Sequence, residues 1–216
     1  MHKTLFLSLD PDPTIGGLLL RYKRRVLELA GPQMFLDHPP HVTAYLANFS
    51  AQAIVLEAAK KLADEVTPQE ISIIGWHVFE RDQLTGGNTL VFQFDEATQR
   101  RLRTLQRKVV DCLAPLRHNA ATKRRYRNRF ANLLEVEKQS IEERGFPFTG
   151  ANWHPHLTVA SVRPDNWPPV AAELLAETPR IVGLCSSITV YRLQSGQPVA
   201  VKTFPLRREN HHERAG

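Results

Sequence analysis

Two short stretches of the chain each place a threonine two residues after a histidine. The first is PPHVTAYL, which contains His41 and Thr43, and the second is HPHLTVAS, which contains His156 and Thr158. Both share the pattern Pro-His-aliphatic-Thr, and a chain with nine histidines is expected to hold fewer than one His-x-Thr tripeptide by chance. Side chains alternate along a strand, so the histidine and threonine of each stretch share one face. We interpret the two stretches as copies of one motif.

The paired motifs could perform acid–base chemistry on a phosphate group. If the two strand faces are opposed, both imidazoles and both hydroxyls converge on one point. Threonine hydroxyls can donate hydrogen bonds to phosphoryl oxygens, and histidine exchanges a proton near neutral pH. A neutral imidazole would take a proton from the attacking water or hydroxyl, while a protonated imidazole would deliver one to the leaving oxygen. The pattern therefore predicts a phosphate site, and this chemistry needs no metal.

Ordinary packing and a metal centre are the alternatives. A single half-buried histidine on a strand is more often structural than catalytic. Four imidazoles near the motifs could also supply enough ligands for zinc. They belong to His38, His41, His154 and His156. In a zinc site, however, the paired threonines would have no role.

The two motifs resemble the paired His-x-Thr signatures of the two-histidine (2H) phosphoesterase superfamily. Its members include RNA 2′,3′-cyclic phosphodiesterases, the so-called 2′-5′ RNA ligases and nucleotide cyclic phosphodiesterases. The resemblance implies that His41, Thr43, His156 and Thr158 form the catalytic set, without a metal or another cofactor. It implies a phosphodiester substrate, with opening of a 2′,3′-cyclic phosphate on an RNA end or a nucleotide as the leading hypothesis. A cyclic phosphate of ADP-ribose or an oligonucleotide linkage is the close alternative.

Strands and helices alternate in a similar order in the two halves of the chain. Strands are predicted at residues 3–9, 41–47, 71–79, 88–94, 182–192 and 198–206, with another beginning near 155, and helices at 18–29, 52–65, 97–115 and 169–176. Ser50 is expected to cap the second of these helices. The pattern predicts an α+β fold of mainly antiparallel sheets with outer helices.

The resemblance adds a prediction of domain organisation. It implies one domain over residues 1–206 that consists of two pseudo-symmetric lobes with the active-site cleft between them. The stretch 117–152 is longer than a compact family member requires, and we expect a partly helical insertion there, basic at 117–129. The tail 207–216 lacks apolar anchors and is expected to be disordered.

Side chains near the motifs are candidates for substrate binding. Aromatic rings can stack on a nucleobase, and an additional imidazole can help to position the substrate. The candidates are Phe6, Tyr45, Phe148, Trp153 and His154. Packing is the alternative for each aromatic residue, and a place on a polar rim is the alternative for the histidine.

The positive charge of the chain is concentrated in one stretch. The chain has 28 basic and 22 acidic residues, and residues 117–129 contain six of the basic residues and none of the acidic ones. Five of these could follow a phosphate backbone, namely Lys123, Arg124, Arg125, Arg127 and Arg129. A solvated helical face is the alternative interpretation. If only this patch were functional, the protein would be an RNA-binding module without turnover.

Composition and hydropathy bound the location of the protein. No run of about 18 apolar residues is present, and the N-terminal apolar stretch is too short for a signal peptide. The chain has two cysteines, Cys112 and Cys185, which are too few for a disulfide framework. We therefore expect a cytoplasmic monomer that does not associate with membranes and acts on an RNA or nucleotide phosphodiester.

Overall fold

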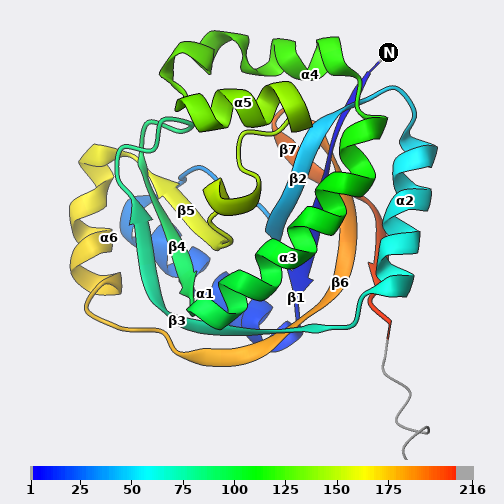
Figure 1. The fold of residues 1–216 in the computed structure, drawn as a ribbon. Coiled ribbons are helices and arrows are strands. Elements are labelled where there is room, and N and C mark those ends of the chain that lie inside the picture. The colour runs from blue at the N-terminus through cyan, green and yellow to red at the C-terminus, as the bar shows by residue number, and fades with distance from the viewer. Residues whose placement is uncertain (1, 208–216) are drawn as a thin grey trace, which may run out of the picture.

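The structure, a computed structural model, describes residues 2–207 (Figure 1). The strands are β1 (Lys3–Pro11), β2 (Val42–Phe49), β3 (Gln69–Phe79), β4 (Asn88–Phe94), β5 (Leu157–Val162), β6 (Ile181–Gln194) and β7 (Gln197–Pro205). The α-helices are α1 (Pro13–Ala30), α2 (Gln52–Glu65), α3 (Glu96–Leu113), α4 (Asn119–Tyr126), α5 (Glu135–Arg144) and α6 (Trp167–Leu174). Short 3-10 helices are η1 (Ala114–Leu116), η2 (Arg127–Asn132), η3 (Gly150–Asn152) and η4 (Pro164–Asn166).

The strands form a seven-stranded antiparallel sheet in the order β2-β1-β6-β3-β4-β5, with β7 paired to β6. The long strand β6 joins two lobes. Its residues 181–185 pair with β3, whereas its residues 187–192 pair with β1 on one side and with β7 on the other. Strands β1, β2 and β7 thus belong to one lobe, and β3, β4 and β5 belong to the other. The predicted α+β fold of mainly antiparallel strands with outer helices is confirmed.

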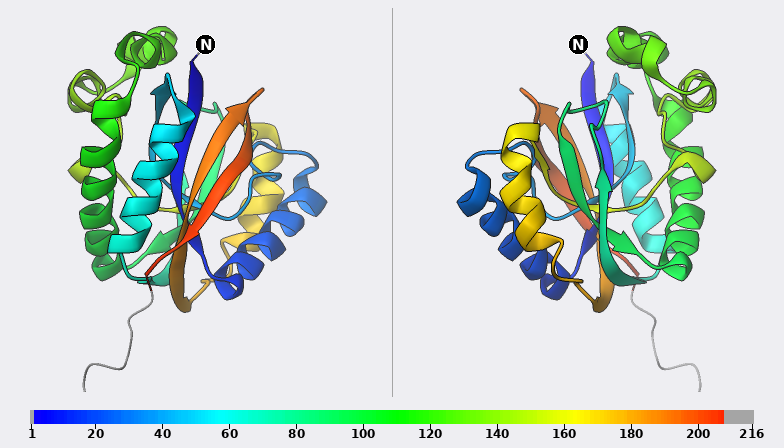
Figure 2. Two further views of the ribbon diagram at one scale, coloured as in Figure 1. Left: turned by 90° about the vertical axis from the view of Figure 1, so that its right-hand side faces the viewer. Right: turned by 90° about the vertical axis from the view of Figure 1, so that its left-hand side faces the viewer.

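Helices cover the outer side of both lobes (Figure 2). Helix α3 follows β4 in the chain but packs on β2, and α1 follows β1 but packs on β5 and on α6. Each lobe is therefore covered in part by a helix that follows a strand of the other lobe. One face of α3 is apolar and buried, and it consists of Leu102, Leu105, Val109 and Leu113. This exchange of helices holds the lobes in a fixed relative position.

The start of α1 and the cap of α2 differ from the sequence predictions, whereas the bounds of α2 are as predicted. Helix α1 begins at Pro13 because the Asp12 side chain accepts a hydrogen bond from the backbone N–H of Ile15 at 3.0 Å. In the second Asp-Pro pair, the aspartate is thus the N-cap, and the proline occupies the N1 position that proline favours. The expectation that Ser50 caps α2 is wrong, because Ala51 occupies the N-cap position and no side chain caps this helix.

Both motif strands contain a bulge directly after the motif threonine. In β2, Thr43 pairs with Ser8 but Tyr45 pairs with the adjacent Leu7, so one residue of β2 has no partner. In β5, Thr158 pairs with Val91, and the next residue of β5 likewise has no partner in β4. An extra residue reverses the alternation of side chains beyond it. The two motifs therefore share the local backbone irregularity as well as the residue types.

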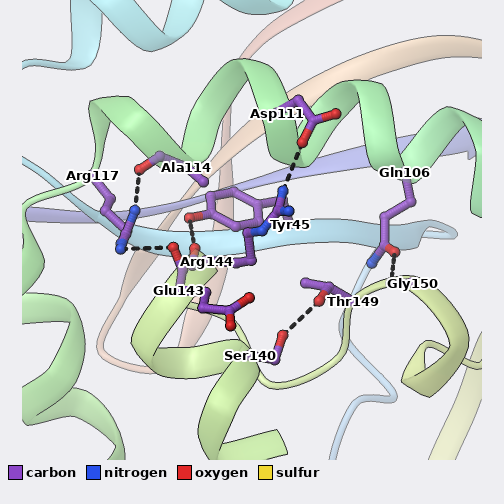
Figure 3. Close-up of polar contacts among 10 residues, drawn as sticks. All are labelled: Tyr45, Gln106, Asp111, Ala114, Arg117, Ser140, Glu143, Arg144, Thr149 and Gly150. Atoms are coloured by element: carbon purple, nitrogen blue, oxygen red, sulfur yellow. Dashed lines mark hydrogen bonds and ion pairs between the residues drawn. The ribbon is translucent and has the colours of Figure 1, made fainter. Parts of the chain in front are cut away.

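The bulge in β2 moves Tyr45 from the predicted face into the core. Its side chain is completely buried, and its hydroxyl donates a hydrogen bond to the carbonyl of Arg144 at 2.5 Å (Figure 3). Its ring packs edge-on against Phe146. The prediction that Tyr45 stacks on a substrate base is wrong, because neither ring face is free.

Residues 117–152 form α4, η2, α5 and η3, as the expectation of a partly helical segment requires. The helices enclose a small apolar cluster of their own, formed by Tyr126, Phe130, Leu133 and Ile141. Helix α4 is fixed to the edge strand β2, because the Asn48 side-chain amide donates to the carbonyl of Ala121 at 3.2 Å. That this segment is an insertion remains a proposal.

A polar network attaches α5 to α3 (Figure 3). Arg144 forms an ion pair with Asp111 at 2.7 Å, and Arg117 donates to the carbonyl of Glu143 at 3.1 Å. Beyond α5, the N–H of Gly150 donates to the Gln106 side chain at 3.1 Å. The segment that leads into the second motif is thus held along α3.

The ends of the chain add little to this architecture. Residues 208–216 of the predicted disordered tail lie outside the described residues. The backbone N–H of Arg207 donates to the carbonyls of Ala63 and Val66.

Cys112 and Cys185 are both free. Within residues 2–207, no helix has the length and apolar character needed to cross a membrane.

Substitution of Tyr45 by phenylalanine tests the anchoring of α5. The change removes the hydroxyl that donates to the Arg144 carbonyl and leaves the ring in place. We expect Tyr45→Phe to lower the free energy of unfolding by about 1 kcal/mol, the usual net value of a buried hydrogen bond. Urea denaturation followed by circular dichroism measures this difference. A variant as stable as the wild type would show that the bond does not hold α5.

Candidate active site

The four motif residues lie at the starts of β2 and β5, the two strands that end the path of paired strands. His41 and His156 each immediately precede their strand, and Thr43 and Thr158 are each the second residue in it. In Figure 1 the two strands run apart from the middle of the view. A positive charge on His156 lowers the pKa of His41, so the imidazoles lie within electrostatic reach of each other. This electrostatic effect is the observation that links the two motifs, and the catalytic role of the four residues stays a prediction.

Each motif histidine is held by the same hydrogen bond. The Nδ1 atom of His41 lies 2.7 Å from the carbonyl oxygen of Pro39, and that of His156 lies 2.7 Å from the carbonyl oxygen of His154. A carbonyl oxygen only accepts, so Nδ1 carries a proton in both rings. The neutral form of each ring therefore has its free lone pair on Nε2. Both histidines present the same atom for proton transfer.

Burial lowers the pKa of both motif histidines, because a charged imidazole loses hydration there. The pKa of His41 falls to about 4, and the positive charges of His38, Lys23 and His156 add to the effect of burial, while the Pro39 carbonyl opposes it. The pKa of His156 is lowered mainly by burial and further by His77. The His154 carbonyl and the Asp82 carboxylate oppose that shift. Both rings are neutral near pH 7 in the free protein.

Aromatic rings support His41 in the first lobe. The Phe6 ring stacks on Tyr191 with centroids 4.9 Å apart and lies 5.3 Å from the His41 ring. Phe6 is only 4% exposed, so it packs beneath the imidazole and offers no face to a base. The packing alternative thus holds for Phe6. The contact of Tyr191 with Phe6 could not be predicted from the sequence, because it depends on the pairing of β1 with β6.

A second set of rings surrounds His156 in the other lobe. Phe79 lies 5.2 Å from the His156 ring and 5.6 Å from the His154 ring, and His77 lies 4.8 Å from His154. His154 also contacts the side-chain oxygen of Gln93 through Nε2 at 3.2 Å. Because His77, Phe79 and His154 are all partly exposed, this wall could contact a substrate. His77 and Phe79 share a face of β3 by period two, the only signal of their role in the sequence.

Two of the other candidate stacking residues belong to packing. Trp153 is 4% exposed, and its carbonyl accepts a hydrogen bond from Arg103 at 3.1 Å. Phe148 packs edge-on against Phe146, and its carbonyl accepts from Gln106 at 2.8 Å. These residues fix the segment that leads to His156 against α3. The prediction that Trp153 stacks on a base is wrong, because its ring is buried, as the ring of Tyr45 is.

Half-buried carboxylates accept hydroxyl hydrogen bonds in both lobes. Ser8, which pairs with Thr43, donates to Asp10 at 2.6 Å, and Ser187 donates to the same carboxylate at 3.3 Å. In the second lobe, Thr89 donates to Asp82 at 2.7 Å. Burial raises the pKa of Asp10, although the hydroxyl bonds oppose the shift. The similarity between the lobes thus extends from the motifs to the polar groups around them.

The four imidazoles near the motifs do not converge as zinc ligands. The rings are arranged in two stacked pairs, His38 with His41 at 6.3 Å and His154 with His156 at 6.2 Å. Within residues 2–207, no group of three or more His, Cys, Asp or Glu side chains has the geometry to hold a metal ion. The structure does not support the zinc alternative.

The predicted basic patch is divided by local contacts. Lys123 forms an ion pair with Glu142, and Arg125 is partly buried. Arg129 lies over the Tyr126 ring at 5.6 Å. Exposed cations remain at two positions of the patch, Arg124 and Arg127, which line a surface hollow between α4 and α5.

Known proteins share this fold. The sequence model of the 2′-5′ RNA ligase superfamily matches residues 11–197. The crystal structure of TT0787 of Thermus thermophilus covers 96% of this chain and 100% of its own, with 15% identity and a TM-score of 0.58. E. coli LigT complexed with NADP+ covers 96% and 100%, with 14% identity and a TM-score of 0.56. LigT complexed with ATP covers 96% and 100%, with 15% identity and a TM-score of 0.53. The comparison with curated sequences finds no match.

The lowered histidine pKa values predict loss of stability in mild acid. His38, His41 and His154 have pKa values of about 4 in the folded protein, against 6.5 for an unperturbed histidine. Between these values the unfolded chain binds protons that the folded protein does not, so unfolding becomes easier as pH falls. Each group contributes at most about 1.4 kcal/mol per pH unit in this window. Solvent screening reduces the share of the two less buried rings.

Urea denaturation near pH 7 and near pH 5 measures this effect. We expect the free energy of unfolding to fall by about 2 kcal/mol or more over the interval. The double variant His41→Gln, His156→Gln should show a shallower dependence, because glutamine does not titrate. Equal stability of the wild type at both pH values would contradict the assignment of these histidines as buried and neutral.

Proposed function

The chain belongs to the 2′-5′ RNA ligase superfamily, and from this we propose that it is a metal-independent phosphodiesterase that opens a 2′,3′-cyclic phosphate. The resemblance inferred from the two motifs is thus confirmed at the level of the superfamily, whose members are phosphoesterases. The observation that carries the proposal is the matched pair of Nδ1–H bonds, at 2.7 Å in each lobe. They leave two Nε2 atoms for proton transfer.

The proposed reaction adds water across one phosphorus–oxygen bond. Nε2 of one neutral imidazole accepts a proton from water as the water oxygen attacks phosphorus. The bond from phosphorus to the 2′ or the 3′ oxygen breaks, and Nε2–H of the other imidazole gives its proton to that oxygen. The products are a phosphomonoester and a free vicinal hydroxyl. Solvent then restores the proton to one imidazole and removes it from the other.

The free protein has two neutral imidazoles, so one of them must gain a proton before it acts as an acid. A bound diester carries a negative charge, and an opposite charge nearby raises the pKa of an imidazole. Substrate binding therefore favours protonation of the ring closer to the leaving oxygen. General acid and general base catalysis each contribute about 10²- to 10⁴-fold to the rate.

The threonines bind the phosphoryl oxygens in this proposal. Thr43 and Thr158 lie two residues after the motif histidines, on the same strand faces. A hydroxyl that donates to a charged oxygen contributes about 1.5–3 kcal/mol. The bulge after each threonine separates this polar face from the apolar side chains that follow. Each lobe thus supplies one proton-transfer group and one phosphate-binding group.

The nature of the substrate follows from chemistry and from related structures. LigT has been crystallised with NADP+ and with ATP, so a protein of this fold binds nucleotide phosphates. The partly exposed wall of His77, Phe79 and His154 offers rings that a nucleobase could stack against. We propose a nucleotide or an RNA end as the substrate, with the protein acting as a cytoplasmic monomer. Another diester, such as a cyclic phosphate of ADP-ribose, would use the same pair of histidines.

Hydrolysis of a 2′,3′-cyclic phosphate in EDTA tests this function. The substrates are a short oligoribonucleotide with a 2′,3′-cyclic end and free 2′,3′-cyclic nucleotides, and the products are separated as 2′- and 3′-phosphates. We expect turnover by the wild type and a loss of at least about 10²-fold in kcat/KM for His41→Gln and for His156→Gln. Thr43→Val and Thr158→Val should each lose roughly 10- to 100-fold.

The exposed His2 provides the matched control, because His2→Gln removes an imidazole far from the motifs in the chain. Its activity should equal that of the wild type. Folded wild-type protein could fail to turn over these substrates and yet hydrolyse another diester in a reaction that needs both histidines. That result would reject the proposed substrate class and keep the two-histidine mechanism. Activity that persists in the double histidine variant would contradict the mechanism.

The exposed cations Arg124 of α4 and Arg127 of η2 predict a preference for longer RNA. If the chain of an RNA substrate passes Arg124 and Arg127, the variant with both changed to Gln should raise KM for the oligonucleotide but not for a cyclic mononucleotide. The slope of log affinity against log salt should fall by about 0.7 for each lost phosphate contact. Arg100→Gln with Arg107→Gln removes the same charge from α3 and is the control. Equal effects of both pairs would exclude a specific RNA path over α4.

A further inference from the structure

Asp10 is a half-buried carboxylate in the first lobe that the proposed reaction does not use. It lies on β1 and accepts a hydrogen bond from Ser8 of the same strand at 2.6 Å. None of the ion pairs formed within residues 2–207 includes it. A carboxylate loses hydration on burial, and most buried charges have an opposite charge as a partner. An unpaired carboxylate in this place calls for a role.

Hydroxyl groups of β1 and β6 hold this carboxylate in place of a cation. Ser8 donates to Oδ1 at 2.6 Å, Ser187 donates to Oδ2 at 3.3 Å, and Thr189 donates to Oδ2 as well. Thr189 also shares a hydrogen bond with the Thr203 hydroxyl of β7 at 2.8 Å. Burial raises the pKa of Asp10, whereas each of the three donors lowers it and so favours the ionised form. The hydroxyls thus solvate the charge and fix its position.

Strand register places Asp10 beside the first motif. In the pairing of β1 with β2, Ser8 lies opposite Thr43 and Leu9 lies opposite Val42. Side chains alternate along β1, so Asp10 points to the same face as Ser8, which is the face of Thr43. Two residues along a strand and one strand spacing correspond to about 8 Å between the backbones of Asp10 and Thr43. The carboxylate thus lies within electrostatic reach of a phosphate bound to Thr43.

The second lobe has a neutral side chain at the matching place. In each lobe, the first residue of the motif strand has a partner in the neighbouring strand, and one residue follows that partner. This residue is Asp10 beside β2 and Gln93 beside β5. The Gln93 side-chain oxygen contacts Nε2 of His154 at 3.2 Å and carries no net charge. The lobes match in motif and register, but this position holds a carboxylate in the first lobe and an amide in the second.

A carboxylate beside a phosphate site discriminates between ligands by their charge. Its repulsion is proportional to the charge of the ligand, so a phosphodiester with one negative charge experiences half the repulsion of a phosphomonoester with two. Hydrolysis of a cyclic phosphate converts a singly charged diester into such a monoester. A carboxylate in this place therefore weakens binding of the product more than binding of the substrate.

We propose that Asp10 is a specificity-determining residue whose negative charge selects singly charged phosphodiesters over phosphomonoesters and promotes release of the product. This inference rests on the proposed function, because it requires that the phosphate binds between the two motifs. The carboxylate takes no part in proton transfer. It acts through space on the charge of the ligand, and its hydroxyl partners keep it in position.

Binding of two probes that contain no cyclic phosphate tests the inference directly. The first probe, 2′-deoxyadenosine 3′-phosphate, carries two negative charges near pH 8, and the second, its methyl ester, carries one. Isothermal titration calorimetry gives the ratio of their dissociation constants. In Asp10→Asn this ratio should shift by roughly 5- to 30-fold in favour of the monoester, as expected for one charge at about 8 Å and an effective dielectric constant of about 20 to 40. An unchanged ratio in the folded variant would overturn the inference.

Two control variants separate the charge of Asp10 from its hydrogen bonds. Asp64→Asn removes the same charge from an exposed position on α2, and the ratio should not change. Ser187→Ala removes one hydrogen bond to the carboxylate and keeps its charge, so it should lower the melting temperature without a shift in the ratio. A shift in either control as large as that in Asp10→Asn would overturn the inference.

The wild type provides a test that does not depend on folding of a variant. Near pH 8 it should bind the methyl ester more tightly than the monoester, and His41→Gln should weaken binding of both probes. Tighter binding of the monoester by the wild type would overturn the inference, and so would failure of the folded wild type to bind either probe.

Activity then separates this inference from the proposed function. With a 2′,3′-cyclic nucleotide as substrate, the inhibition constant of the phosphomonoester product should fall in Asp10→Asn by a larger factor than KM. Turnover of the cyclic phosphate with an unchanged ratio of the two probes would reject the role of Asp10 and keep the function. A shifted ratio in a protein that opens no cyclic phosphate would reject the function and keep charge selection by Asp10.

Discussion

The hydrogen bond from an imidazole Nδ1–H to the backbone carbonyl two residues earlier determines what this site can do. The bond occurs in both lobes with the same 2.7 Å distance. It fixes the tautomer, orients the ring and leaves the lone pair on Nε2. Without it, a histidine at the start of a strand could rotate and exchange tautomers, and the threonine on the same face would have no fixed partner. The loops before β2 and β5 therefore have to place two carbonyl groups as well as two imidazoles.

The rest of the fold serves that placement. Strand β6 pairs with both lobes, and α1 and α3 each pack on the lobe opposite to the strand that they follow in the chain. The bulges after Thr43 and Thr158 return the following side chains to the core, so a short polar face can exist within an otherwise apolar strand. The segment before the second motif is tied to α3 by hydrogen bonds from Gln106 and Arg103. The loop before the first motif is held by a hydrogen bond from Lys23 to Phe35 and by the bridge between Met34 and Ser161.

Local patterns predicted most of the elements and the motif residues, because periodicity and the His-x-Thr pairs are properties of short segments. The sequence could not show the bulge that buries Tyr45, since an unpaired residue in one strand is defined by its partner strand. The roles of His77 and Phe79 depend on which strands become neighbours. The burial of Lys23 on α1 was also hidden, because its acceptor is a loop carbonyl and a single lysine on an amphipathic helix normally faces solvent. The Asp12 cap of α1 and the Asp95 cap of α3 were local signals that were missed.

The most direct measurement of the central claim is the tautomer of the two motif histidines. Long-range ¹H–¹⁵N correlation spectra of the ring nitrogens near pH 7 distinguish a protonated nitrogen from one with a free lone pair. The account predicts a protonated Nδ1 and an unprotonated Nε2 in both His41 and His156. A protonated Nε2, or rapid exchange between tautomers, in either ring would contradict the hydrogen-bonded arrangement from which the function is inferred.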